Sequence, residues 1–212
     1  MKNLNQIFDR IFVITIPSFV DRIENMKRRL EGVDYEFFYG VYGGDLDVTP
    51  YRESGSKLTR GQLSCAISHY QIYEKIVDEN IQNALILEDD CDFNDQISNI
   101  VDYTNQLPDE YSVFYLGYQE DYAGCTYSSN LNILTGGGVG HTHAMNVKKS
   151  CAEMLLEFNK NLIWTADGVF NELSKKYNIE YYLANPKIAF QDNKGADDST
   201  LVIVDKVYGF GF

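Results

Sequence analysis

Strand signals and helix signals alternate along this chain of 212 residues, and this alternation constrains the fold more than any other feature. Residues 11–16 form an apolar run that ends at Pro17, and we interpret the run as a buried strand. Residues 84–87 form a second apolar run, with the pattern of a strand that is covered on both faces. Residues 59–62 match a capping box that begins a long helix. The alternation predicts an α/β fold with a mainly parallel central sheet.

Further elements follow from apolar spacing and from turn residues. Ser18 and Thr165 are the predicted N-caps of two other helices. A glycine-rich stretch at residues 136–140 is a predicted loop. The remaining predictions are helices over residues 19–30, 96–106, 148–158 and 165–176, and strands over 35–41, 112–116, 180–183 and 188–190. No internal repeat or domain linker interrupts this order.

The charge of the chain restricts its partners. A formal net charge of −13 argues against nucleic acid, because phosphate backbones require clustered Lys and Arg. The four cysteines stand singly, without the paired spacing typical of zinc sites, so we expect reduced thiols. No signal-peptide pattern and no apolar run of transmembrane length is visible. These features predict a cytoplasmic protein without an integral membrane segment.

Three consecutive carboxylates follow the second apolar run: Glu88, Asp89 and Asp90. Ligands bind beyond the carboxyl ends of strands in an open α/β sheet. Adjacent buried carboxylates repel one another unless a cation lies between them, and Mg²⁺ and Mn²⁺ prefer oxygen ligands of this kind. A solvated acidic turn is the alternative, since Asp is an ordinary turn residue. The residues alone leave both interpretations open.

Several ordered motifs carry a resemblance to a known family. They are residues 11–26 with Asp21-Arg22, the run Leu63-Ser-Cys-Ala-Ile-Ser-His69, the run Ala84-Leu-Ile-Leu-Glu-Asp-Asp90, and His143-Ala-Met-Asn-Val. Their order over roughly residues 10–200 resembles that of family 25 glycosyltransferases, which include lipopolysaccharide, lipooligosaccharide and collagen galactosyltransferases. This chain differs from the family pattern at Ser64, where the family has Gly, and at Met145, where it has Tyr.

The resemblance implies one GT-A-type nucleotide-sugar transferase domain over residues 1–212, with a nucleotide-sugar half at about 1–110 and an acceptor half at about 111–212. It implies inverting transfer of a hexose, most often galactose, from a UDP-sugar, with Mn²⁺ or Mg²⁺ as cofactor. The acceptor would be a hydroxyl of a glycan or of a lipid-linked or protein-linked glycoconjugate. A lipid-linked acceptor would place the cytoplasmic protein at the membrane surface as a peripheral protein. Asp90 would bind the metal, while Glu88 and Asp89 would contact the substrate.

Other residues have predicted roles at the same site. Asp167 is the candidate catalytic base, and Trp164, the only Trp of the chain, is the candidate platform for a sugar ring. A neutral imidazole suits Mn²⁺, and we favour His143 over His69 as the ligand. Ser68, His69 and Arg22 are candidate substrate contacts, and Arg60 is a second candidate for the diphosphate. For each of these residues an ordinary structural role is the alternative.

Two other functions use the same features. A sugar nucleotidyltransferase also has an acidic metal site, but its chemistry favours a glycine-rich, basic loop after the first strand, where this chain has Ile16, Pro17 and Ser18. A non-catalytic nucleotide- or sugar-binding module on the same fold is the third interpretation. The three acids together with Asp167 favour the transferase.

Overall fold

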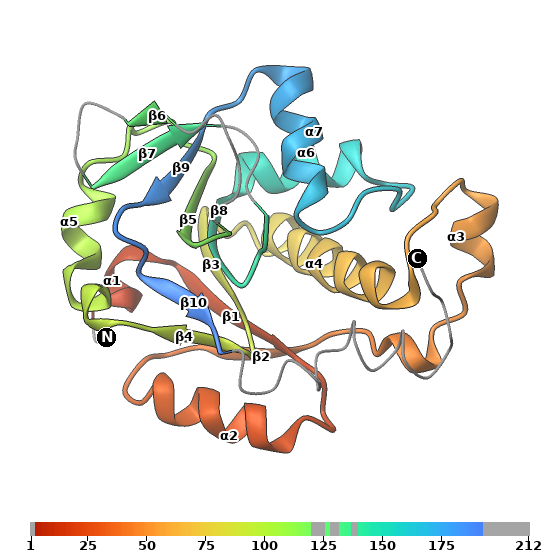
Figure 1. Ribbon diagram of the computed structural model, residues 1–212, viewed down its shortest axis with the longest axis horizontal. Coiled ribbons are helices and arrows are strands. Elements are labelled where there is room, and N and C mark those ends of the chain that lie inside the picture. Colours follow the sequence, from red (N-terminus) through yellow and green to blue (C-terminus); the bar gives the residue numbers. More distant parts are fainter. Residues whose placement is uncertain (1–2, 120–125, 128–131, 137–139, 193–212) are drawn as a thin grey trace.

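A twisted eight-stranded sheet forms the centre of the protein (Figure 1). The computed structural model describes residues 3–119, 126–127, 132–136 and 140–192. The strand order is β2-β1-β3-β8-β5-β9-β7-β6. The strands are β1 (Arg10–Thr15), β2 (Glu36–Tyr39), β3 (Asn83–Glu88), β5 (Val113–Gly117), β6 (Thr126–Tyr127), β7 (Ile133–Gly136), β8 (Ala144–Lys148) and β9 (Tyr181–Ala184).

The predicted α/β class and the mainly parallel sheet are confirmed. Strand β1 pairs in parallel with β2 and β3, and β5 pairs in parallel with β9. Strand β8 lies antiparallel between β3 and β5, and β7 lies antiparallel between β9 and β6. All strands except β7 and β8 therefore run in one direction.

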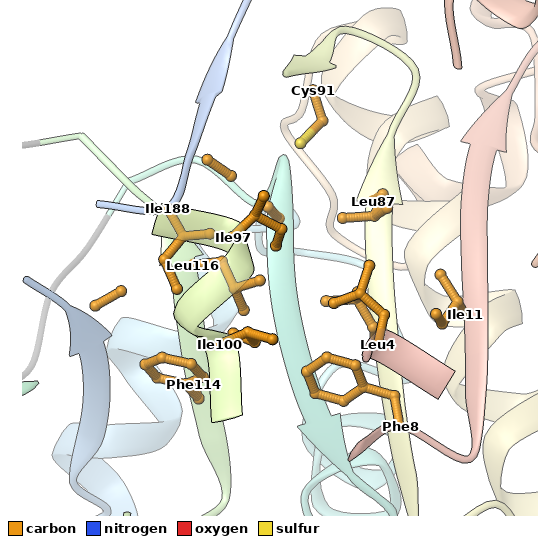
Figure 2. Packing of buried hydrophobic residues seen from close by; sticks show 14 of the residues in the cluster. Leu4, Phe8, Ile11, Leu87, Cys91, Ile97, Ile100, Phe114, Leu116 and Ile188 are labelled. Carbon is orange, nitrogen blue, oxygen red and sulfur yellow. The ribbon is translucent and has the colours of Figure 1, made fainter. Parts of the chain in front are cut away.

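Helices cover both faces of the sheet. One face packs against α1 (Leu4–Ile7), α2 (Val20–Arg29) and α5 (Ile100–Thr104), and Figure 2 shows part of this cluster around Leu4, Phe8 and Leu116. The other face packs against α4 (Arg60–Asp78), α6 (Lys149–Phe158) and α7 (Gly168–Tyr177). Three shorter helical elements are η1 (Gly43–Asp45), α3 (Thr49–Glu53) and η2 (Asp95–Asn99).

Side chains of β3 alternate between the two faces, as strand geometry requires. Leu85 and Leu87 belong to the α2 side, whereas Ala84 and Ile86 belong to the α4 side. Glu88 continues the second series and therefore points toward α4. The predicted strand at residues 84–87 is thus confirmed, and its alternation decides the direction of the first acid.

The helix starts test the predicted caps. The capping box of α4 is confirmed: Thr59 accepts a hydrogen bond from the Gln62 N–H, and the Gln62 side chain accepts one from the Thr59 N–H. The Ser18 cap is wrong, because α2 begins after Phe19 and no side chain caps it. Helix α7 also begins later than predicted. Asp167, not Thr165, stands at its N-cap, although the Thr165 hydroxyl also accepts a hydrogen bond from the Gly168 N–H.

A small second sheet has two strands, one directly after the three acids and one near residue 190. Strand β4 (Cys91–Phe93) begins directly after Asp90 and pairs antiparallel with β10 (Ala189–Gln191), which places Gln191 opposite Cys91. The predicted loop at residues 136–140 is described only in part: Gly136 ends β7, and residues 137–139 lie outside the described ranges. Among the described residues, no helix has the length and apolar composition needed to cross a membrane.

Candidate active site

The three acids lie at the carboxyl end of β3, against the end of β1. Parallel pairing places Ile14 of β1 beside Glu88, so Thr15 comes next to Asp89. A cavity of about 130 Å³ opens here, with room for a hydrated cation. Its walls are formed by Ile14, Thr15, Ile16, Arg22, Val41, Gly61, Ser64, Cys65, Ser68, His69, Glu88, Asp89, Asp90 and Gln191.

Asp89 is held by the protein itself. Its two carboxylate oxygens accept hydrogen bonds from the Thr15 hydroxyl and from the Arg22 guanidinium, each at 2.7 Å. Burial raises the pKa of Asp89, and the Thr15 and Arg22 contacts act in the opposite direction. Asp89 therefore fixes Arg22 at the cavity wall.

Glu88 is held from the opposite side of the cavity. Its Oε1 atom lies 3.1 Å from His69 Nε2 and accepts a 2.7 Å hydrogen bond from the Thr142 hydroxyl. Burial acts to raise the pKa of Glu88, but His69, Thr142 and His143 together outweigh burial and lower that pKa to about 2. Glu88 is therefore a fixed negative charge on the α4 side of the cavity.

Asp90 is less completely satisfied than its two neighbours. Gln191 Nε2 donates to Oδ2 at 3.3 Å, whereas the buried Oδ1 atom has no hydrogen-bond partner within the described part of the chain. Burial and repulsion from Glu88 and Asp89 raise the pKa of Asp90 to about 7, with Arg22 acting against them. A buried carboxylate oxygen without a partner is costly, and a cation would relieve the cost. The residues present therefore fit a divalent cation at Asp90.

Asp167 approaches the same region from the start of α7. Its Oδ1 atom accepts hydrogen bonds from the Thr165 hydroxyl and the Gly168 N–H, and its Oδ2 atom accepts one from the His141 N–H at 3.2 Å. Asp167 does not line the cavity, but its charge acts on the thiol of Cys65, which does. Asp167 thus contacts His141, whose neighbour Thr142 binds Glu88, and so lies near the acidic cluster, although positions 90 and 167 are 77 apart in the sequence.

The two candidate histidines have different surroundings. His69 lines the cavity on α4 and contacts Glu88. His143 is buried outside the cavity lining, and neither of its ring nitrogens has a hydrogen-bond partner among the described residues. Burial, together with His141 and Lys187, lowers the pKa of His143 to about 4 against the opposing charge of Glu88, so its ring is neutral near pH 7. The role of His143 as a metal ligand stays a prediction.

The remaining candidates for substrate binding lie in different surroundings. Arg22 and Ser68 line the cavity, but the Ser68 hydroxyl accepts from the Val41 N–H and donates to the Ser64 carbonyl. Trp164 packs against the sheet cluster on the α4 side and does not line the cavity. Arg60 donates to the carbonyl of Leu46 at 2.5 Å. Their predicted substrate contacts stay predictions.

Sequence reasoning assigned no role to several residues at this site. Thr15 and Thr142 hold two of the acids, Gln191 supports the third, and Cys65 lines the cavity. Cys65 and His69 stand four residues apart on a predicted helix, a spacing that places both on one helix face. That spacing was the available signal for Cys65.

Comparison with known proteins relates the chain to glycosyltransferases. A crystal structure of a glycosyltransferase involved in the glycosylation of the major capsid of PBCV-1 aligns with a TM-score of 0.46 and 11% identity, over 80% of this chain and 76% of that one. Procollagen galactosyltransferase 1-A of Xenopus laevis is 36% identical over 101 residues, which is 41% of this chain and 16% of the relative. Procollagen galactosyltransferase 2 of Homo sapiens is 27% identical over 129 residues, which is 52% of this chain and 21% of the relative.

The two sequence matches to procollagen galactosyltransferases cover only 16% and 21% of the length of those relatives. The model of glycosyltransferase family 25, described as an LPS biosynthesis protein family, matches residues 8–170. This range includes the three acids at the end of β3, the Cys65–His69 face of α4 and Asp167. The chain belongs to glycosyltransferase family 25.

Proposed function

We propose that the chain transfers a hexose, with galactose as the first candidate, from a UDP-sugar to a hydroxyl group, with inversion at the anomeric carbon and with Mn²⁺ or Mg²⁺ as cofactor. Membership of family 25 supports a glycosyl transfer. The names of the relatives, which are procollagen galactosyltransferases, favour galactose. A GT-A-type domain organisation is part of the same proposal.

The observation that carries this proposal is the buried Oδ1 atom of Asp90, which has no hydrogen-bond partner among the described residues. Glu88 and Asp89 already have partners in Thr142, His69, Thr15 and Arg22, so the chain leaves Asp90 as the acid that a cation would complete. Asp90 would hold the cation, and His143 is the proposed second protein ligand. When bound, a divalent cation supplies positive charge that stabilises the diphosphate leaving group.

The residues of the chain supply the other requirements of the transfer. Arg22, fixed by Asp89 at the cavity wall, offers a guanidinium to the diphosphate. Asp167 would accept the proton of the acceptor hydroxyl as its oxygen attacks the anomeric carbon. Two donors already occupy Oδ1 of Asp167 and one occupies Oδ2, so Oδ2 is the more available atom for that proton.

The acceptor is proposed only as a class. A glycan hydroxyl on a lipid-linked or protein-linked conjugate fits both the family description, which names LPS biosynthesis, and the relatives, which are named for procollagen. The net charge of −13 argues against nucleic acid as a partner.

Calorimetry and product analysis with matched variants test the proposal. Wild-type protein is expected to bind UDP more tightly with Mn²⁺ than without it, and to release UDP from UDP-galactose in the presence of an acceptor sugar. Asp90→Asn should lose the metal-dependent part of UDP binding. Asp167→Asn should retain that binding and lose about 100-fold or more in turnover. Asp102→Asn, at an exposed position of α5, is the control and should change neither property.

Each alternative gives a different result. UDP binding without any transfer from UDP-hexoses would identify a binding module. Release of pyrophosphate from UTP and a sugar phosphate would identify a nucleotidyltransferase. Metal-dependent UDP binding that survives in Asp90→Asn would remove the acidic cluster from the site.

A further inference from the structure

A cysteine, a histidine and a glutamate lie close together in the lining of the cavity. Cys65 and His69 stand four residues apart on α4 and so share one helix face, and Glu88 ends the adjacent strand β3. One ligand atom from each of these three side chains lies within 4.8 Å of the other two. This donor set combines sulfur, nitrogen and oxygen, whereas the proposed cation at Asp90 requires oxygen ligands.

The spacing of these atoms suits a tetrahedral ion. Zinc forms bonds of about 2.0–2.2 Å to histidine nitrogen and carboxylate oxygen, and of about 2.3 Å to thiolate sulfur. At a tetrahedral angle, two ligand atoms at about 2.05 Å from the ion are about 3.3 Å apart. His69 Nε2 and Glu88 Oε1 lie 3.1 Å apart. The ion would thus replace the hydrogen bond between them with little movement of either side chain.

The surroundings hold the ligands in place and favour a cation. The Thr142 hydroxyl fixes Glu88 Oε1 at 2.7 Å, and His69 is 1% exposed, so neither side chain must be ordered when an ion binds. Burial, together with the charges of Glu88, Asp90 and Asp167, raises the pKa of the Cys65 thiol, so an ion has to displace the thiol proton, while the same negative charges attract a cation. All three candidate ligands line the cavity, so an ion can reach them from solvent and can keep one coordination position open.

We propose that Cys65, His69 and Glu88 form a binding site for Zn²⁺ or a divalent transition-metal ion of similar softness, distinct from the oxygen-ligand site at Asp90. Nitrogen and thiolate ligands favour such ions over Mg²⁺ and Mn²⁺. Three protein ligands leave the fourth position for water or an oxygen atom of a ligand in the cavity. Formation of the metal–sulfur bond releases the thiol proton to solvent.

A consequence for regulation rests on the proposed transferase function. Glu88 would serve both as a zinc ligand and as a wall of the nucleotide-sugar cavity. Zn²⁺ added at saturating Mn²⁺ is therefore expected to inhibit transfer, and Cys65→Ser should reduce that inhibition.

Spectroscopy with Co²⁺ tests the site without any need for activity. The metal-stripped chain of 212 residues, kept reduced, is titrated with Co²⁺. Wild-type protein is expected to develop a near-ultraviolet thiolate-to-cobalt charge-transfer band, which one equivalent of Zn²⁺ abolishes. Cys65→Ser should remove the band, and His69→Gln should lower Co²⁺ affinity by about 10-fold or more. Circular dichroism is used to check that each variant is folded. If Cys65→Ser does not fold, Cys65→Ala takes its place.

Two controls determine which residues bind the ion. Cys125→Ser, at a cysteine outside the described residues, should retain the band, and loss of the band in this variant instead of Cys65→Ser would overturn the proposal. Asp90→Asn should also retain the band while it loses Mn²⁺-dependent UDP binding. A band lost in Asp90→Asn would mean that the thiolate and Asp90 bind one common ion, which contradicts a separate site. The absence of any charge-transfer band in wild-type protein would refute the site but would leave the proposed transfer function untouched.

Discussion

The ion pair between Arg22 and Asp89 gives a direct test of how the site is assembled. The guanidinium nitrogen lies 2.7 Å from the Asp89 carboxylate, and the side chains are 17% and 8% exposed. Arg22→Met removes the charge and retains the aliphatic stem. Asp89 would keep the Thr15 hydroxyl on its Oδ2 atom, while its other oxygen would lose the Arg22 hydrogen bond.

The expected cost follows from the burial of the pair. Removing one partner of a buried ion pair costs about 3–5 kcal/mol, since a buried charge loses its compensation. Water that reaches the exposed edge of Arg22 lowers this figure, so we expect the free energy of unfolding to fall by about 2–3 kcal/mol near pH 7.5. Burial already raises the pKa of Asp89 and Arg22 opposes that rise, so the variant carboxyl should accept a proton more readily. The cost should therefore shrink as the pH falls toward 5.

Urea unfolding of metal-stripped protein, followed by circular dichroism, measures this cost. Asp89→Asn in the Arg22→Met background should recover at least half of it, because the neutral amide no longer needs a cation. Arg10→Met is the matched control: Arg10 is 46% exposed, its ion pairs with Glu36 and Glu79 are 3.6 Å long, and its loss should cost less than about 1 kcal/mol. An equal cost at Arg22 and Arg10, or no recovery in the double variant, would refute the reasoning.

Three other substitutions have defined outcomes. Gly117→Ala should lower the unfolding free energy by about 2 kcal/mol in urea titrations, because the new Cβ would lie 2.2 Å from His143 Nε2 and 2.5 Å from the Ala189 carbonyl oxygen; an unchanged midpoint would show that both neighbours can move. Thr59→Ala should cost about 1 kcal/mol through loss of the α4 cap, and equal stability would deny the capping box that role. Between pH 5 and pH 8, the free energy of unfolding of Asp90→Asn should rise by on the order of 2 kcal/mol relative to that of metal-free wild-type protein. The reason is that a pKa of about 7 gives the wild type stability at low pH that is lost as pH rises through 7; parallel stability curves would contradict this.

The sequence predicted those elements that can be recognised from residues close together in the chain. The capping box at Thr59 and the apolar run of β3 need no distant partner, and both are confirmed. Strand β8 was not predicted as a strand, and Asn146 interrupts the apolar pattern at its centre. Asn146 can be buried because its side chain forms hydrogen bonds with the side chains of Tyr111 and Asn83 and with the Ala84 carbonyl, all distant in sequence. Such partners become neighbours only when the sheet has formed.

The site shows the same division. Adjacency alone indicated Glu88, Asp89 and Asp90, but their partners come from β1, α2, α4, β10 and the segment before β8. Thr15 reaches Asp89 only because the parallel register places Ile14 beside Glu88. The sequence contains no CxxC pair, and no cysteine–histidine spacing in it was taken to indicate zinc, although Cys65 and His69 are separated by one helical turn.

Three carboxylates in a row would have similar surroundings in an unfolded chain, and the fold makes their surroundings different. Strand alternation directs Glu88 toward α4, where His69 and Thr142 fix its charge. Asp89 turns toward β1 and α2, where it fixes Arg22. Asp90 retains a buried oxygen without a hydrogen-bond partner among the described residues, and it carries the repulsion of both neighbours. A cation that binds Asp90 is therefore attracted by carboxylates that the protein already holds in place. Replacing any one of the three acids with its amide would measure how much that acid contributes to the affinity for the cation.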